Sequence, residues 1–362
     1  MIYSKEFESR KDKINQICKT LNGRDDKIIL QTLYSVANIE ETQIGTNLQE
    51  RLSSTQYSNE SLSEFLNHFK REEFNYYSKK DLEILFQELH NRECKTSGIE
   101  PRYIVSVKSN KDDRSNGYMV PGSNELNING TMIDRYKHIE SSHNYGKNEN
   151  TIGAHSVFTL IHETQHTCQM EGVMNFALNR ETTKEERGRD AIFFLDLIVA
   201  EYAEKAGDQA LSAYISNAYW FNYMEHHSNM APVKFMKNAI KNGDIKDQVF
   251  LDALAYRTTN DIHIKEQPTE KRVLDMEKVI NKYIGILKNN FQNGPLKKQL
   301  VSVLDEFTKL DDKGHSMLRD TLRKDFQEAK DLIKYCESNS QLSKADKKKQ
   351  LYSNIDFEML PE

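Results

Sequence analysis

The apolar positions of this chain recur mostly at helical spacing near both of its ends. Examples are Leu62, Phe65, Leu66 and Phe69 in the first hundred residues, and Val273, Met276, Ile280 and Ile284 near the other end. Apolar residues every three or four positions in a polar background predict amphipathic helices that pack one face into a core. We therefore expect a helical N-terminal region over residues 1–98 and a helical C-terminal region over residues 231–362.

The period changes in the central part of the chain, residues 99–230. Three short runs there predict strands: Tyr103–Val107, Tyr118–Val120 and Glu125–Asn129. The last run alternates polar and apolar residues and follows a turn at residues 121–124, as strands of a hairpin or meander do. The pattern predicts an α+β fold that is predominantly α-helical, with a small antiparallel sheet packed on central helices.

Two apolar helices are predicted after these strands. The first contains Val157, Phe158, Leu160 and Ile161 and is apolar on more than one face, which indicates burial. Ser156 is a typical N-cap and Gly172 a typical helix end. A second helical run, from about Asp190 to Tyr223, is strongly apolar in its first half.

The first apolar helix contains the sequence His162-Glu163-Thr164-Gln165-His166, which has the form H-E-x-x-H. Histidines at i and i+4 lie on one helical face, so both imidazoles can bind the same metal ion, while Glu163 lies beside the open coordination position. A chance match has a prior of about a few per cent in a chain of this composition. The strongly apolar surroundings favour a functional motif, because uncompensated buried charges are costly.

A catalytic zinc usually has three protein ligands and one water, so a third ligand is needed. The metzincin form of the motif is excluded, because Gln169 stands at its glycine position and Gly172 at its third histidine. Glu201 interrupts the second apolar helix and is the expected ligand. Glu204 lies on the same face and is expected either to orient a ligand histidine or to replace Glu201.

A second polar cluster, Glu225, His226 and His227, follows an aromatic segment. One of the two histidines is an alternative third ligand in place of a glutamate, or a group that stabilises the transition state; surface histidines explain the cluster equally well. The candidates for stabilising an oxyanion are Tyr219, Tyr223 and His227.

These motifs resemble the zincin metallopeptidases, and within them the gluzincin group, whose third ligand is a glutamate on a downstream helix. His166-Thr167-Cys168-Gln169 resembles the H-E-x-x-H-x-x-Q form of some bacterial and toxin-associated members. In this chain Lys205 replaces the acid that gluzincins carry four residues after the ligand. The resemblance spans residues 100–230 approximately and implies a zincin-like core over 99–230, a Zn²⁺ cofactor and a protein or peptide substrate. It also implies an edge strand that pairs with the substrate, here Glu125, Leu126, Asn127, Ile128 and Asn129.

Composition limits the classes of partner. The formal net charge is −5, so no basic surface points to nucleic acid, and no apolar stretch has the length of a membrane span. The four cysteines lack C-x-x-C spacing and no signal peptide opens the chain, which favours the cytoplasm or secretion into a host cell by a signal-peptide-independent route. The Asn- and Lys-rich composition is typical of AT-rich bacterial genomes and fits a bacterial effector or toxin.

The favoured hypothesis is a zinc endopeptidase in which Glu163 acts as general base. The alternative is a helical interaction or effector protein with a structural or degenerate H-E-x-x-H motif. A metal hydrolase with a non-peptide substrate is a third possibility. Zinc content distinguishes the second hypothesis from the others, and a substrate screen distinguishes the first from the third.

Overall fold

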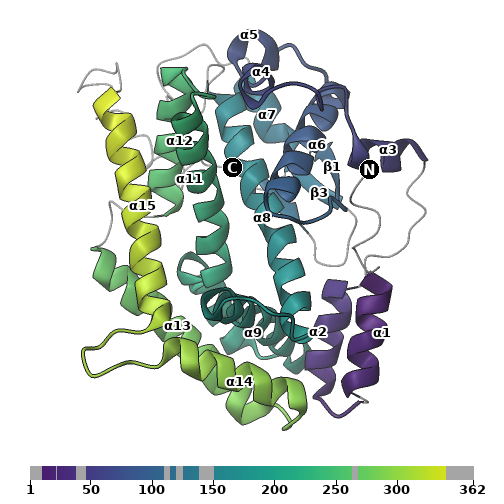
Figure 1. Cartoon of the computed structure of the whole chain (residues 1–362), viewed down its shortest axis with the longest axis vertical. Coiled ribbons are helices and arrows are strands. Elements are labelled where there is room, and N and C mark those ends of the chain that lie inside the picture. Colours follow the sequence, from purple (N-terminus) through teal and green to yellow (C-terminus); the bar gives the residue numbers. More distant parts are fainter. Residues whose placement is uncertain are drawn as a thin grey trace.

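A computed structural model describes residues 10–21, 23–37, 46–109, 115–119, 125–137, 151–262 and 268–339. The chain is mostly helical with a small three-stranded sheet, as predicted (Figure 1). The first elements are α1 (Arg10–Leu21), α2 (Lys27–Ala37), α3 (Thr46–Ser53), α4 (Leu62–Asn67), α5 (Arg71–Phe74), α6 (Lys79–Thr96), β1 (Ile104–Lys108), β2 (Gly117–Met119), β3 (Glu125–Asn129) and α7 (Gly130–Lys137). They are followed by α8 (Ile152–Ala177), α9 (Lys184–Ala206), α10 (Gln209–Asn217), the 3-10 turn η1 (Tyr219–Phe221), α11 (Tyr223–Asn242), α12 (Gln248–Asp261), α13 (Thr269–Asn290), α14 (Pro295–Thr308) and α15 (Met317–Asn339).

Helix α8 contains the H-E-x-x-H motif and passes through the middle of the fold (Figure 1). It packs against α6 and the sheet on one side and against α11 and α12 on the other, which explains why it is apolar around most of its circumference. It extends beyond both predicted ends. The Ser156 hydroxyl donates to the Ile152 carbonyl within the helix, and a Cβ atom on Gly172 would overlap the carboxylate of Asp190 on α9. Gly172 therefore permits close packing of two helices instead of ending one.

The sheet has the order β1-β3-β2 and is mixed, not antiparallel as predicted. Strand β1 runs parallel to β3, with Val105 opposite Leu126, while β2 runs antiparallel to β3, with Tyr118 opposite Asn127. The prediction that Glu125–Asn129 forms an edge strand is wrong, because β3 is paired on both sides. Four of its five residues are buried, as suits a central strand. Within the described ranges the strand beside α8 with one unpaired edge is β2.

Gly117, the first residue of β2, lies directly against α8. A Cβ atom at this position would stand 2.9 Å from the Asn127 carbonyl oxygen, 3.1 Å from the Thr159 side chain and 3.2 Å from Cγ of Glu163. Glycine is needed because any larger residue would collide with a backbone atom on one side and the motif helix on the other. The backbone of β2 thus borders the residues of the motif.

The predicted helical run from about Asp190 to Tyr223 is divided. Helix α9 ends at Gly207, whose φ of 61° is in the left-handed region, and α10 and η1 then change the direction of the chain. The side chain of Asn222 accepts a hydrogen bond from the backbone N–H of Glu225 and begins α11. Two later helices therefore pack against α8: α9, as expected, and also α11.

One cluster of buried apolar side chains includes residues of the N-terminal, central and C-terminal parts of the chain. The division into regions 1–98, 99–230 and 231–362 stays a prediction. In the part of the chain that the structure describes, none of the helices combines the length and apolar character that crossing a bilayer requires.

Candidate metal centre

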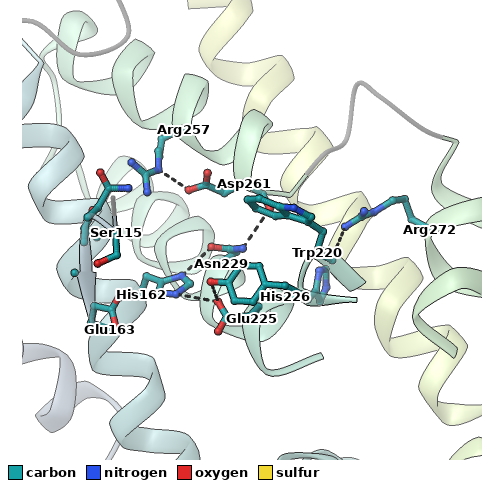
Figure 2. A pocket seen from close by; sticks show the side chains of 14 residues that line it. Ser115, His162, Glu163, Trp220, Glu225, His226, Asn229, Arg257, Asp261 and Arg272 are labelled. Carbon is teal, nitrogen blue, oxygen red and sulfur yellow. Dashed lines mark hydrogen bonds and ion pairs between the residues drawn. The ribbon is translucent and has the colours of Figure 1, made fainter. Parts of the chain in front are cut away.

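His162 and His166 of α8 and Glu225 of α11 converge on one point (Figure 2 shows His162 and Glu225). The two Nε2 atoms are 3.2 Å apart, and they lie 3.4 and 3.6 Å respectively from the nearer carboxylate oxygen of Glu225. Ligands at about 2.0–2.1 Å from a tetrahedral zinc are separated by about 3.3 Å from one another. The donor atoms therefore have the type and spacing of a three-ligand zinc site.

His162 is held by a hydrogen bond to its other ring nitrogen. Its Nδ1 donates to Oδ1 of Asn229, one turn after Glu225 on α11, at 2.8 Å. The amide of Asn229 is oriented in turn, because its Nδ2 donates to the Asp261 carbonyl at the end of α12 over 3.2 Å. With the proton on Nδ1, the lone pair of Nε2 faces the centre.

His166 is held in the same way by Gln169. Its Nδ1 donates to Oε1 of Gln169 at 2.8 Å, and the Gln169 amide nitrogen donates to the Met224 carbonyl at 2.9 Å and to Ser228 at 3.0 Å. Metal-binding histidines commonly have such a partner, which selects the tautomer and orients the ring. Gln169, the glutamine of the H-E-x-x-H-x-x-Q sequence, is this partner of His166.

The Nε2 atoms of two imidazoles and a carboxylate thus face one another in a buried space. Burial alone lowers the pKa of His162, but hydrogen bonding to Glu225 and the charge of Glu163 raise that pKa to about 9. Burial raises the pKa of Glu225, yet its contacts with His162 and His166 lower it to about 2. The centre is an environment that stabilises positive charge, which a divalent cation supplies.

Glu163 is buried beside the centre, where burial raises the pKa of its carboxyl group above the usual range and the two histidines oppose that rise. It lines a cavity of about 250 Å³ together with His162 and Glu225. The other lining residues come from the start of β2 (Ser115, Asn116, Gly117), α8 (Thr159), η1 (Tyr219, Trp220), α11 (His226, Asn229), α12 (Arg257, Asp261) and α13 (Arg272) (Figure 2). A buried carboxyl group next to an open cavity is suited to proton transfer.

The third donor is Glu225, which corrects the expectation of Glu201. Glu201 lies near the end of α9, where its carboxylate pairs with Lys205 at 2.6 Å. Lys205 occupies the position at which the gluzincin pattern has an acid, and it engages the carboxylate that was expected to bind metal. Glu204 is exposed, and the roles expected of it belong to Asn229 and Gln169.

The three residues expected near an oxyanion have different positions. Tyr219 lines the cavity, and its hydroxyl donates to Glu225 at 2.8 Å. Tyr223 is buried and does not line the cavity. His227 packs against the rings of Phe193 and Tyr223, also away from the cavity lining.

The sequence analysis did not predict that Asn229 and Gln169 orient the histidines. The sequence does contain a pattern that indicates α11 as the helix with the third ligand. Glu225 and Asn229 are spaced i, i+4, like the two histidines, so one face of α11 presents the ligand and the partner of a ligand. Asn222 is also a strong N-cap residue, which indicates a helix beginning just before Glu225.

Comparisons with protein-family models, with curated proteins and with solved structures return no match. The likeness to zincins consists of the arrangement itself: two histidines one turn apart on α8 and a glutamate on a later helix. This arrangement is a possible metal-binding site of two histidines and one glutamate.

Proposed function

We propose that the protein is a zinc-dependent metallopeptidase that hydrolyses peptide bonds in protein substrates. The observation that carries the proposal is the convergence of His162, His166 and Glu225, each histidine having its Nδ1 engaged by an amide oxygen. The donor set is that of catalytic zinc sites with two histidines and a glutamate. Zinc bound there would act as a Lewis acid and lower the pKa of a water ligand to about 7.

Glu163 is the general base of this proposal. Its carboxylate accepts a proton from the attacking water and delivers it to the nitrogen of the leaving amine. Burial raises the pKa of its carboxyl group and so favours proton uptake, while the charges of His162 and His166 oppose that rise. Tyr219 supports the site by donating to the ligand carboxylate of Glu225.

The substrate strand of the proposal is β2, in place of β3. An extended peptide can add to the unpaired edge of a sheet through backbone hydrogen bonds. Because Gly117 brings β2 against Glu163, a peptide bound along β2 would pass beside the base and the metal ligands. Residues 115–117 line the cavity, which supports peptide binding at this end of β2.

The decisive experiment compares the parent protein with Glu163→Gln. We expect one zinc per chain in both proteins, and a loss of peptide cleavage of roughly 10²–10⁴-fold in the variant, because only the proton-accepting group is removed. Zinc is measured by elemental analysis and cleavage by mass spectrometry of a proteome digest. The exposed Glu204→Gln is the matched control and should cleave like the parent.

Two outcomes would contradict the proposal. A folded protein without metal affinity would favour a helical interaction protein with a degenerate motif. A zinc protein that cleaves no peptide in the digest, or whose Glu163→Gln variant keeps full activity, would instead indicate another substrate or another mechanism.

A further inference from the structure

Arg257 of α12 lines the same cavity as His162 and Glu163. Its Nε donates to Asp261 at 2.5 Å, and the guanidinium lies over the ring of Phe158, 5.2 Å from the ring centroid. Only 13% of the side chain is exposed. The arginine is therefore held in one orientation, with its charge directed into the cavity that contains the proposed reaction site (Figure 2).

The outer nitrogens of Arg257 face a neutral acceptor. In the orientation of the Asn116 amide that satisfies both of its groups, the oxygen accepts from Nη1 at 3.1 Å and from Nη2 at 2.8 Å. A carboxylate binds a guanidinium fork more strongly than an amide oxygen does, because both partners are charged and two parallel hydrogen bonds form. A carboxylate that entered the cavity could therefore replace Asn116 at these nitrogens.

Three acids line the cavity, and one of them, Glu163, is the proposed base. Glu225 faces the two histidines, and Asp261 accepts from Nε of Arg257. Arg272, the other arginine of the lining, donates to the Trp220 carbonyl and lies over the Phe221 ring. Of these two arginines, Arg257 is the one next to the motif helix.

We propose that Arg257 binds a carboxylate of the substrate close to the cleaved bond, and so determines specificity. This inference rests on the proposed peptidase function. The carboxylate has two possible sources, an Asp or Glu side chain or the C-terminus of the peptide, and both present the same group to the guanidinium.

Binding can be measured without turnover, because Trp220 lines the cavity, is 53% exposed and is the only tryptophan of the chain. The zinc-loaded Glu163→Gln protein is titrated with tryptophan-free peptides of one sequence, in which a single Glu is moved along the chain. Each peptide has a Gln counterpart, and all are made with a free and an amidated C-terminus. Tryptophan fluorescence reports the dissociation constant.

We expect about tenfold or stronger preference for Glu over Gln at one position, or for the free over the amidated C-terminus. The first result identifies a side chain and the second a C-terminal carboxylate. Adding Arg257→Gln should remove the preference, and Arg257→Lys should keep part of it, because the charge remains but the fork is lost. Arg135→Gln, at an exposed arginine of α7 outside the cavity lining, is the control and should keep the preference.

Equal affinity for all acid and amide pairs in the Glu163→Gln protein would overturn the inference, as would a preference that survives Arg257→Gln. Circular dichroism shows whether Arg257→Gln folds. If it does not, the test rests on the ratio of dissociation constants for each acid and amide pair, measured in the Glu163→Gln protein with and without Arg257→Lys. Cleavage of the same peptides by the parent protein is scored separately. Peptides that bind with the acid preference but are not cleaved contradict the peptidase function alone, and cleavage without preference contradicts the role of Arg257 alone.

Discussion

Helices α9 and α11 both pack on α8 and both carry glutamates, but only α11 presents one to the histidines. Glu201 of α9 lies in an apolar run, is 28% exposed and pairs with a lysine one turn later on its own helix. Glu225 of α11 is in the first turn of its helix, is 19% exposed and faces His162 and His166. Apolar neighbours indicate that a helix is buried. A lysine one turn away from a glutamate on that helix indicates that the carboxylate already has a partner.

The two helices also differ in what they supply to the centre. Helix α11 supplies the ligand Glu225 and the partner of His162, Asn229. Helix α9 packs against the start of α11, with its buried Asp196 close to the backbone of Met224, next to the ligand. Helix α11 therefore carries one of the three donors, and α9 packs against the start of α11 through Phe193 and Tyr223.

The largest difference between the two helices is expected when each glutamate is removed. We expect Glu225→Ala to weaken zinc binding by more than about 100-fold, since even residues that only orient a ligand contribute 10–100-fold. Glu201→Ala should leave zinc affinity unchanged and alter stability by less than about 1 kcal/mol, because it removes only a partly exposed ion pair. Competition with a zinc chelator measures the affinity. Equal losses in the two variants would mean that α9 also takes part in the site.

A smaller effect is expected from the residues that orient the histidines. Asn229→Ala and Gln169→Ala should each lower zinc affinity by about 10–100-fold, because the Nδ1 proton loses its acceptor and the tautomer is no longer selected. Glu204→Ala is the control on α9 and should bind zinc like the parent. The idea would fail if the two amide variants matched this control in calorimetric titrations with zinc.

The last prediction concerns the contact between α9 and the start of α11. Burial raises the pKa of Asp196 to about 8, although the Met224 N–H opposes the shift. A carboxyl group whose pKa is higher in the folded than in the unfolded protein contributes stability below its unfolded pKa of about 4, and this contribution is lost as the pH rises to about 8. Asp196→Asn cannot ionise, so its unfolding free energy relative to the parent should increase between pH 5 and pH 8. Urea unfolding of the metal-free proteins across this range measures it, and a constant difference would show that Asp196 does not titrate there.

Much of the fold could be predicted because it depends on local patterns. The apolar helix around His162 and Glu163 and the three strands are encoded in nearby residues, and the structure has them. The ends of α8 were misplaced because Gly172 is required by contact with Asp190, a neighbour that the local pattern does not show. Strand order depended on a parallel pairing of β1 with β3, which is also non-local.

The third ligand was misplaced for a related reason. A turn at Gly207 ends α9 and allows a later helix to approach the histidines, and sequence periodicity does not determine which helix returns. Lys205 was the residue that marked Glu201 as a poor ligand, and the i, i+4 pair of Glu225 and Asn229 marked the better helix.

The hydrogen bond from Asn229 to the carbonyl of Asp261 has a consequence for the order in which the site is assembled. His162 is synthesised about a hundred residues before Asp261, whose carbonyl group ends its chain of hydrogen bonds. Until α11 and α12 have folded onto α8, the histidines lack both their carboxylate partner and the acceptor that selects the tautomer of His162. A growing chain would thus gain a complete site only after α12 has been made.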